Sequence, residues 1–279
     1  MVCLPVLAQT SRNPKLESLL AAAHEAQARG DFRAAAGAYK QAVAITPGVA
    51  ELWSNLGLMQ YESHEYLQSE QAFQHALGIN KALFVPNLFI GLDLLELKRT
   101  REAVTFLLAA EKLNPNDTQV LLALGRAYHA SFDPARAREW YQRATDAAPR
   151  NVDAWFGLGV AYLDLAQSAS AKVHGDSAPS AEVTELKALG VAALERVDEI
   201  EPDSPRMHAV VGDVYQRRRM FREAEEEYSK MLALKPDSIA GLAGLAAAYL
   251  YDGHLDEANA TARKALAQDP EDTRYLDLP

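Results

Sequence analysis

Cysteine, basic charge and long apolar runs are all scarce in this chain of 279 residues. Cys3 is the only cysteine, so an intrachain disulfide is excluded and the redox compartment stays open. The 28 basic residues are outnumbered by 38 acidic ones, and the net charge of -10 repels phosphate backbones and anionic lipid headgroups. Nucleic acid is therefore not an expected partner. No apolar run approaches the ~20 residues that a membrane-spanning helix needs, so we expect no transmembrane segment.

The motifs of common enzyme classes are missing as well. The sequence has no phosphate-binding loop, no nucleophile elbow and no HExxH zinc motif, because Gln68 stands where a second histidine would have to follow His64 and Glu65. The seven histidines do not show metal-ligand spacing. We therefore expect no enzyme activity, no metal and no cofactor.

The dominant feature of the sequence is a repeat with a period of about 34 residues, a length typical of stacked supersecondary units. Six prolines mark it: Pro47, Pro115, Pro149, Pro202, Pro236 and Pro270. Three of the five intervals between them are one period long, and the first interval is two periods long. The interval from Pro149 to Pro202 exceeds one period, which indicates an insertion. The sequence therefore predicts a repeat protein.

Alignment on these prolines divides residues 16–272 into seven units. Their bounds are 16–49, 50–83, 84–117, 118–151, 152–204, 205–238 and 239–272. Residues 1–15 and 273–279 remain outside as tails, and the fifth unit contains a loop insertion at about 167–184. We expect the helix after this insertion to start near Ser180 or Ala181.

Each unit repeats the same side-chain sizes at the same positions. Small residues occupy the eighth position, as Ala23, Gly57, Gly91, Gly125, Gly159, Gly212 and Ala246. They recur at the twentieth, as Ala35, Ser69, Ala103, Ala137, Gly190, Ala224 and Ala258. Small side chains allow two helices to approach closely. Each unit is therefore predicted to be a helix hairpin, and the fold class to be all-α.

This pattern resembles the tetratricopeptide repeat (TPR) family. The residues that carry the resemblance are Trp53, Leu56, Gly57, Phe73 and Ala76 in unit two, and Leu124, Gly125, Tyr128, Ala137, Tyr141, Ala144 and Pro149 in unit four. The resemblance covers residues 16–272 and implies an α-solenoid, a right-handed superhelix of stacked antiparallel helix hairpins. It also implies a protein-binding scaffold in which the first helix of each pair lines a concave groove.

The resemblance further implies that the second, fifth, sixth, ninth, twelfth and thirteenth positions of a unit face this groove. In units three to five these positions are largely apolar. The expected partner-binding residues are Val85, Leu88, Phe89, Leu92, Leu95, Leu122, Arg126, His129, Phe156, Val160 and Leu163. A bare apolar band of this size marks a binding site. We expect it to bind an apolar peptide or amphipathic helix of a partner protein, and Phe89→Glu with Phe156→Glu to abolish that binding without loss of fold.

Other interpretations stay open at this point. The insertion (168–181) or the apolar tail from Val2 to Leu7 could cover the band from within the chain. The chain could instead be the regulatory TPR portion of a larger enzyme or secretion assembly, or the carrier of an apolar small molecule. The resemblance disfavours an adaptor for chaperone C-terminal carboxylates, because only Asn55 matches the residues that such a groove requires. The oligomeric state is open, a homo-oligomer included.

Two short segments are also notable. Val6 to Gln9 resemble the end of a secretory signal that lacks its basic start and most of its apolar core. The expected location is cytoplasmic as written, and exported or periplasmic if this segment is a signal-peptide remnant. The run from Arg217 to Arg219 is the only basic cluster, and acidic residues follow it closely. We interpret it as a solvated helix end.

Overall fold

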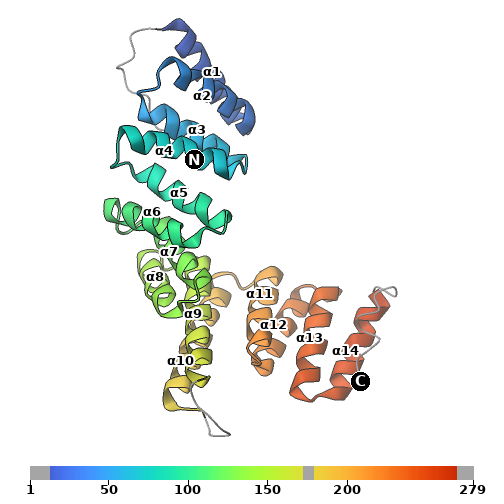
Figure 1. Ribbon diagram of the computed structural model, residues 1–279. Coiled ribbons are helices and arrows are strands. Elements are labelled where there is room, and N and C mark those ends of the chain that lie inside the picture. The colour runs from blue at the N-terminus through green and yellow to red at the C-terminus, as the bar shows by residue number, and fades with distance from the viewer. Residues whose placement is uncertain (1–12, 172–178, 269–279) are drawn as a thin grey trace. The chain divides into compact units, whose positions relative to one another are not determined.

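A computed structural model describes residues 13–171 and 179–268, and these fold into fourteen α-helices (Figure 1). The chain divides into two compact units, Met1–Ala148 and Pro149–Pro279. The apolar tail, the middle of the insertion and residues 273–279 lie outside the described residues. The predicted all-α solenoid of stacked helix hairpins is confirmed.

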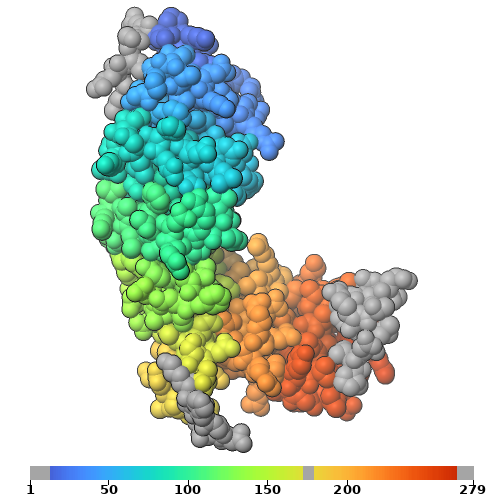
Figure 2. Space-filling view, viewed as in Figure 1, coloured from blue at the N-terminus to red at the C-terminus, as the bar shows by residue number. Residues whose placement is uncertain are grey.

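The first compact unit consists of four helix hairpins. Its helices are α1 (Pro14–Ala28), α2 (Phe32–Ile45), α3 (Ala50–Glu62), α4 (Tyr66–Ile79), α5 (Phe84–Glu96), α6 (Thr100–Leu113), α7 (Thr118–Ala130) and α8 (Pro134–Ala147). The second helix of each hairpin contacts the first helix of the next, and α5 also contacts both α3 and α7. In Figure 2 these hairpins follow one another as bands from blue to green.

The second compact unit continues with three hairpins. Its helices are α9 (Val152–Ser170), α10 (Ala181–Ile200), α11 (Pro205–Arg217), α12 (Phe221–Leu234), α13 (Ile239–Asp252) and α14 (Leu255–Gln268). The predicted start near Ser180 is confirmed, because Ser180 caps α10 by accepting a hydrogen bond from Val183 N at 3.3 Å. The loop begins later than expected, because α9 continues through Ser170 and no glycine or proline interrupts that stretch. No described helix is both long and apolar enough to cross a bilayer.

The hairpin turns share one backbone conformation. Six of them hold a residue with positive φ at the fifteenth position: Gly30, His64, Lys98, Phe132, Arg219 and Gly253. A residue other than glycine is destabilised there by roughly 1 to 2 kcal/mol, so the packing of the flanking helices must hold the turn. In two of these turns the next residue caps the second helix of the hairpin. The Asp31 side chain accepts a hydrogen bond from Ala34 N at 3.0 Å, and the Asp133 side chain accepts one from Arg136 N at 3.1 Å.

The small residues at the eighth position lie where paired helices approach most closely. A Cβ added at Gly91 would lie 2.5 Å from Leu107 Cδ2, and one added at Gly125 would lie 2.6 Å from Tyr141 Cε1. Both distances are shorter than packed carbon atoms tolerate. The close approach predicted from the repeat pattern is therefore confirmed at these hairpins.

Candidate functional site

The apolar residues expected to line the groove on α5 are buried. Four of them expose 8% of their surface or less: Leu88, Phe89, Leu92 and Leu95. The Phe89 ring stacks on Phe73 with centroids 5.7 Å apart and meets the Tyr61 ring edge to face at 4.9 Å. The reason is that α5 contacts α3, α4, α6 and α7, which together cover it on most sides. The expectation of a bare apolar band is wrong for this helix.

The same correction applies to α9. Val160 and Leu163 expose 8% and 2% of their surface, and both belong to a core that includes Val211 and Val214 of α11. Phe156 is half-buried against this core. The apolar character of α9 on several sides therefore reflects packing within its own compact unit.

The accessible residues of the predicted set in the first compact unit lie on α5 and α7, which contact each other. Val85 and Leu122 are half-buried, whereas Arg126 and His129 are exposed. We call these four residues the α5–α7 surface. It is a mixed apolar and polar surface rather than the apolar band that was expected.

A polar cluster adjoins this surface. Arg126 of α7 forms an ion pair with Glu96 of α5 at 3.2 Å. Burial and, after it, the charge of Glu96 raise the pKa of Tyr61 on α3 to about 12, and Arg126 opposes the shift. Three successive first helices thus contribute one residue each. Glu96 was not among the predicted binding residues, although it occupies the thirteenth position of its unit, which is one of the inner positions.

Asp93 is the unusual buried group of the first compact unit. It has no exposed surface, and neither carboxyl oxygen has a hydrogen-bond partner. Burial raises the pKa of Asp93 to about 8, against an opposing effect of the Ser69 hydroxyl nearby. That hydroxyl donates to the Gly57 carbonyl at 3.0 Å and so is already used. Burial therefore favours the protonated carboxyl of Asp93. A polar residue at the tenth position of an apolar helix was the signal in the sequence.

In the second compact unit, His208 takes the place that tryptophan holds in two other hairpins. Each ring N–H at this position donates to a proline carbonyl six residues earlier: Trp53 to Pro47 at 2.8 Å, Trp155 to Pro149 at 2.9 Å, and His208 Nε2 to Pro202 at 3.1 Å. His208 Nδ1 then faces Glu227 Oε2 at 2.9 Å and Asp198 Oδ1 at 3.4 Å. A cation or a proton must lie between these atoms, because all three are acceptors.

The arrangement of Asp198, His208 and Glu227 would suit a metal ion, since their ligand atoms lie within 4.8 Å of one another. However, the Lys230 ammonium already donates to Glu227 Oε1 at 2.7 Å and pairs with Asp198. Burial raises the pKa of Glu227, and the hydrogen bonds from Lys230 and His208 oppose that shift. Lys230 thus occupies the position that a metal ion would need, and we interpret the cluster as an ion-pair and hydrogen-bond network that joins α10, α11 and α12.

Comparison with protein families gives one consistent result. A family model described as Tetratricopeptide repeat matches residues 20–82, 90–151 and 133–171, and a second model with the same description matches residues 216–278. The first model alone covers more than half of the chain.

Two curated proteins illustrate the similarity in sequence. The chain is 31% identical over 121 residues to a UDP-N-acetylglucosamine–peptide N-acetylglucosaminyltransferase of Giardia intestinalis, an alignment that covers 42% of this chain and 8% of that protein. It is 23% identical over 202 residues to anaphase-promoting complex subunit 3 of Schizosaccharomyces pombe, with 72% and 26% covered. The chain thus spans about a quarter or less of the length of these relatives.

Two solved structures illustrate the similarity in fold. A tetratricopeptide repeat protein from Parabacteroides merdae has a TM-score of 0.67 at 14% identity, with 95% of this chain and 98% of that chain covered. YrrB, described as a TPR protein with an unusual peptide-binding site, has a TM-score of 0.52 at 18% identity, with 74% and 97% covered. At these identities the likeness shows the fold alone.

Proposed function

This chain belongs to the tetratricopeptide repeat family, and on that basis we propose that it is a non-enzymatic scaffold whose α5–α7 surface binds a segment of a partner protein. The observation that carries this proposal is the contrast within one set of inner positions. Leu122 and Val85 remain accessible beside the exposed Arg126 and His129, whereas the other apolar residues of α5 are used in helix packing.

The chemistry of this surface favours an amphipathic segment. Val85 and Leu122 offer apolar contact, and Arg126, His129 and the nearby Glu96 offer hydrogen bonds and charge. Full burial of one such apolar side chain contributes about 1.5 to 3 kcal/mol, while association costs about 4 to 15 kcal/mol. Two side chains are therefore too few for tight binding, and we expect micromolar affinity or weaker. Phe156, half-buried in the second compact unit, is a further proposed contact.

A second candidate function is that of a regulatory repeat portion within a larger enzyme or assembly. It is favoured by the alignment to 8% of the length of one enzyme and 26% of the length of one complex subunit. A carrier of an apolar small molecule is less favoured, because six of the eleven side chains that would line its cavity are buried in the packing between helices. The alternative that the chain covers this surface itself involves residues 1–12 or 172–178, which lie outside the described residues.

Paired substitutions test the main proposal. Leu122→Glu with Arg126→Glu places two acidic residues one helical turn apart on the α5–α7 surface. Arg101→Glu with Thr105→Glu makes the same charge change at the same spacing on exposed positions of α6. We expect the first variant, immobilised on beads, to lose the partners that the wild type retains from cell extract, and the second to keep them. Thermal unfolding followed by circular dichroism should confirm that both variants fold.

Two outcomes would overturn the proposal: an unchanged partner set in Leu122→Glu with Arg126→Glu, or an equal loss in the α6 control. Phe89→Glu is no longer a suitable test, because Phe89 is 8% exposed and a buried charge would unfold the hairpin.

A further inference from the structure

A cationic cavity of about 260 Å³ opens in the second compact unit. Its walls come from the last part of α9, from α10 and from the turn between α11 and α12. The lining residues are Leu163, Gln167, Ser170, Lys187, Arg217, Arg218, Arg219 and Met220. No acidic side chain is among these lining residues, although the chain as a whole carries a net charge of -10.

Three of the four cations in this cavity are available to a ligand. Lys187, Arg217 and Arg219 are exposed and form no ion pair with any described residue. Arg218 is different, because its side chain is only 14% exposed, pairs with Asp164 and donates to the Val214 carbonyl at 3.1 Å. Its Nε is buried without a hydrogen-bond partner. Arg218 therefore forms part of the wall, and the other three supply cationic groups without a described ion-pair partner.

Backbone hydrogen bonds fix the turn that carries Arg219 and Met220. Arg219 N donates to the Gln216 carbonyl at 3.0 Å, and Met220 N donates to the Tyr215 carbonyl at 3.0 Å. Arg219 itself has the positive φ of the shared turn conformation. A turn fixed in this way loses little freedom on binding, which favours recognition.

The floor of the cavity is apolar. Leu163 and Met220 are 2% and 7% exposed and belong to the core of this compact unit. A ligand that combines an anionic group with one apolar side chain would match both parts of the cavity. A free inorganic anion would use only the cations.

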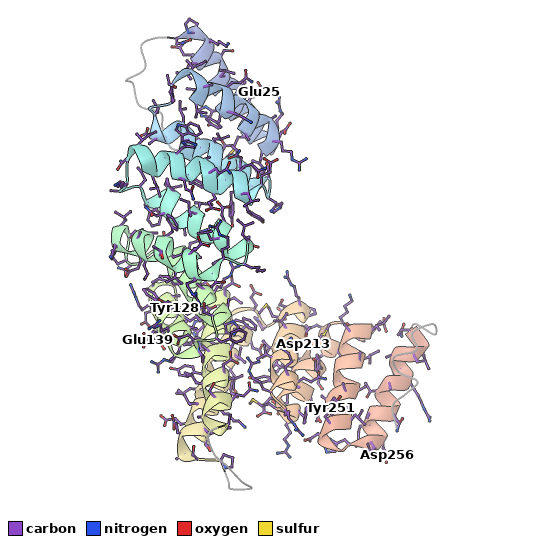
Figure 3. The ribbon with its side chains drawn as sticks, in the orientation of Figure 1. Glu25, Tyr128, Glu139, Asp213, Tyr251 and Asp256 are labelled. Atoms are coloured by element: carbon purple, nitrogen blue, oxygen red, sulfur yellow. The ribbon has the colours of Figure 1, made fainter. Side chains whose placement is uncertain are left out.

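A simpler explanation is that these cations interact with the end of α11. A basic residue near a helix C-terminus is stabilised by the helix dipole, and Arg217 is the last residue of α11. This does not explain Lys187, which lies within α10. Asp213, one turn before Arg217 and labelled in Figure 3, accepts from the Tyr228 hydroxyl at 2.6 Å and forms no described ion pair with Arg217.

A neighbouring cavity provides an internal contrast. It measures about 570 Å³ and shares Lys187, Arg219 and Met220 with the first. Its remaining charged residues are Arg222, Glu195, Glu223 and Asp252, so its three cations are balanced by three acids. Lys187 and Arg219 thus face both cavities, and of the two linings only that of the smaller cavity has no acidic side chain.

We propose that this smaller cavity binds an acidic peptide segment of a partner protein, with an Asp or Glu carboxylate on Lys187, Arg217 and Arg219 and an adjacent apolar side chain on Leu163 and Met220. Arginine clusters recognise acidic motifs in this way. The proposal rests on the role of the chain as a protein-binding scaffold, but not on the α5–α7 surface. The exposure of Arg217 and Arg219 at the end of α11 agrees with the interpretation of this run as a solvated helix end, and the proposal adds a ligand to it.

The test uses fluorescence anisotropy with the full chain and a fluorescein-labelled peptide in which one leucine is flanked by aspartates and glutamates. We expect this peptide to bind, and a peptide with lysine at every acidic position not to bind. Replacement of the leucine by glycine should weaken binding. Arg217→Glu with Arg219→Glu should weaken it at least about tenfold, whereas Arg217→Lys with Arg219→Lys should retain most of it.

The matched control is Arg263→Glu with Lys264→Glu, which makes the same charge change at exposed positions of α14. This control should bind the peptide within about twofold of the wild type. Equal binding of the acidic and basic peptides, an equal loss in the control, or full displacement of the peptide by inorganic phosphate would overturn the proposal. Loss of partner capture in Leu122→Glu with Arg126→Glu is a separate result, because that variant leaves this cavity intact.

Discussion

Two buried carboxylates, Asp93 in the first compact unit and Glu227 in the second, have different surroundings. In the first, Asp93 is fully buried without a partner, and burial raises its pKa to about 8, which favours the protonated carboxyl. In the second, Glu227 is 6% exposed but pairs with Lys230 and His208. The same hairpin architecture thus accommodates a buried carboxyl group in two ways: one group is favoured in its protonated form, and the other is paired with neighbouring side chains. The two solutions should respond in opposite ways to the removal of one group.

The largest effect should follow from removing a partner in the second compact unit. His208→Ala eliminates the N–H donated to Pro202 and leaves Asp198 and Glu227 with one cation. Breaking a buried charged network in this way costs about 3 to 5 kcal/mol. Urea unfolding followed by circular dichroism measures the loss.

His254→Ala serves as the control, because His254 lies in the same compact unit with a side chain 49% exposed, near Glu225 at 3.4 Å. Its effect should stay below about 1 kcal/mol. Equal losses in the two variants would show that the buried network does not stabilise this unit.

Removing the unpaired acid of the first compact unit should have the opposite sign. Asp93 retains its proton in the folded state up to a pKa of about 8, whereas the unfolded chain releases it near 3.8. The contribution of Asp93 to the free energy of unfolding is therefore fully present below pH 3.8, the pKa of this carboxyl in the unfolded chain. It falls as the pH rises toward 8. Between pH 5 and pH 8 the loss is at most roughly 3 to 4 kcal/mol, because one pKa unit corresponds to about 1.4 kcal/mol.

Asp93→Asn should abolish this pH dependence, and it should be more stable than the wild type at pH 8. Urea unfolding of both proteins across this pH range gives the slope. Asp146→Asn, at an exposed position of α8, should leave the slope unchanged. If Asp93→Asn showed the same slope of unfolding free energy against pH as the wild type, the Asp93 carboxyl would already be ionised and solvated in the folded chain.

The repeat pattern predicted the hairpins and their close contacts well, because these depend on residues at fixed separations within one unit. Exposure at the inner positions depends on the helices of the units before and after, and the pattern within one unit does not contain that information. Leu88 and Leu122 occupy the same fifth position, yet Leu88 is 2% exposed while Leu122 is half-buried. The pairing of Arg218 with Asp164 joins residues far apart in the chain, and nothing in the sequence pointed to it.

The smallest expected effect compares one close helix contact in each compact unit. A Cβ added at Gly125 would lie 2.6 Å from Tyr141 Cε1, whereas one added at Gly212 would lie 3.0 Å from Tyr228 Cε1. Forcing an extra methyl into a packed site costs about 1 to 3 kcal/mol, and the better helix propensity of alanine offsets roughly 1 kcal/mol. We expect Gly125→Ala to lose about 1 kcal/mol in urea unfolding and Gly212→Ala to stay within about 0.5 kcal/mol of the wild type.

Gly78→Ala isolates the propensity term, because nothing lies within 4 Å of an added Cβ there, and it should gain about 0.5 to 1 kcal/mol. The comparison depends on whether the tyrosine rings can move. The Tyr228 hydroxyl is held by Asp213 at 2.6 Å and by Gln216 at 2.9 Å. If Gly212→Ala lost more stability than Gly125→Ala, these hydrogen bonds would be stiff enough to outweigh the greater space around Gly212, and anchoring rather than distance would set the tolerance of the eighth position.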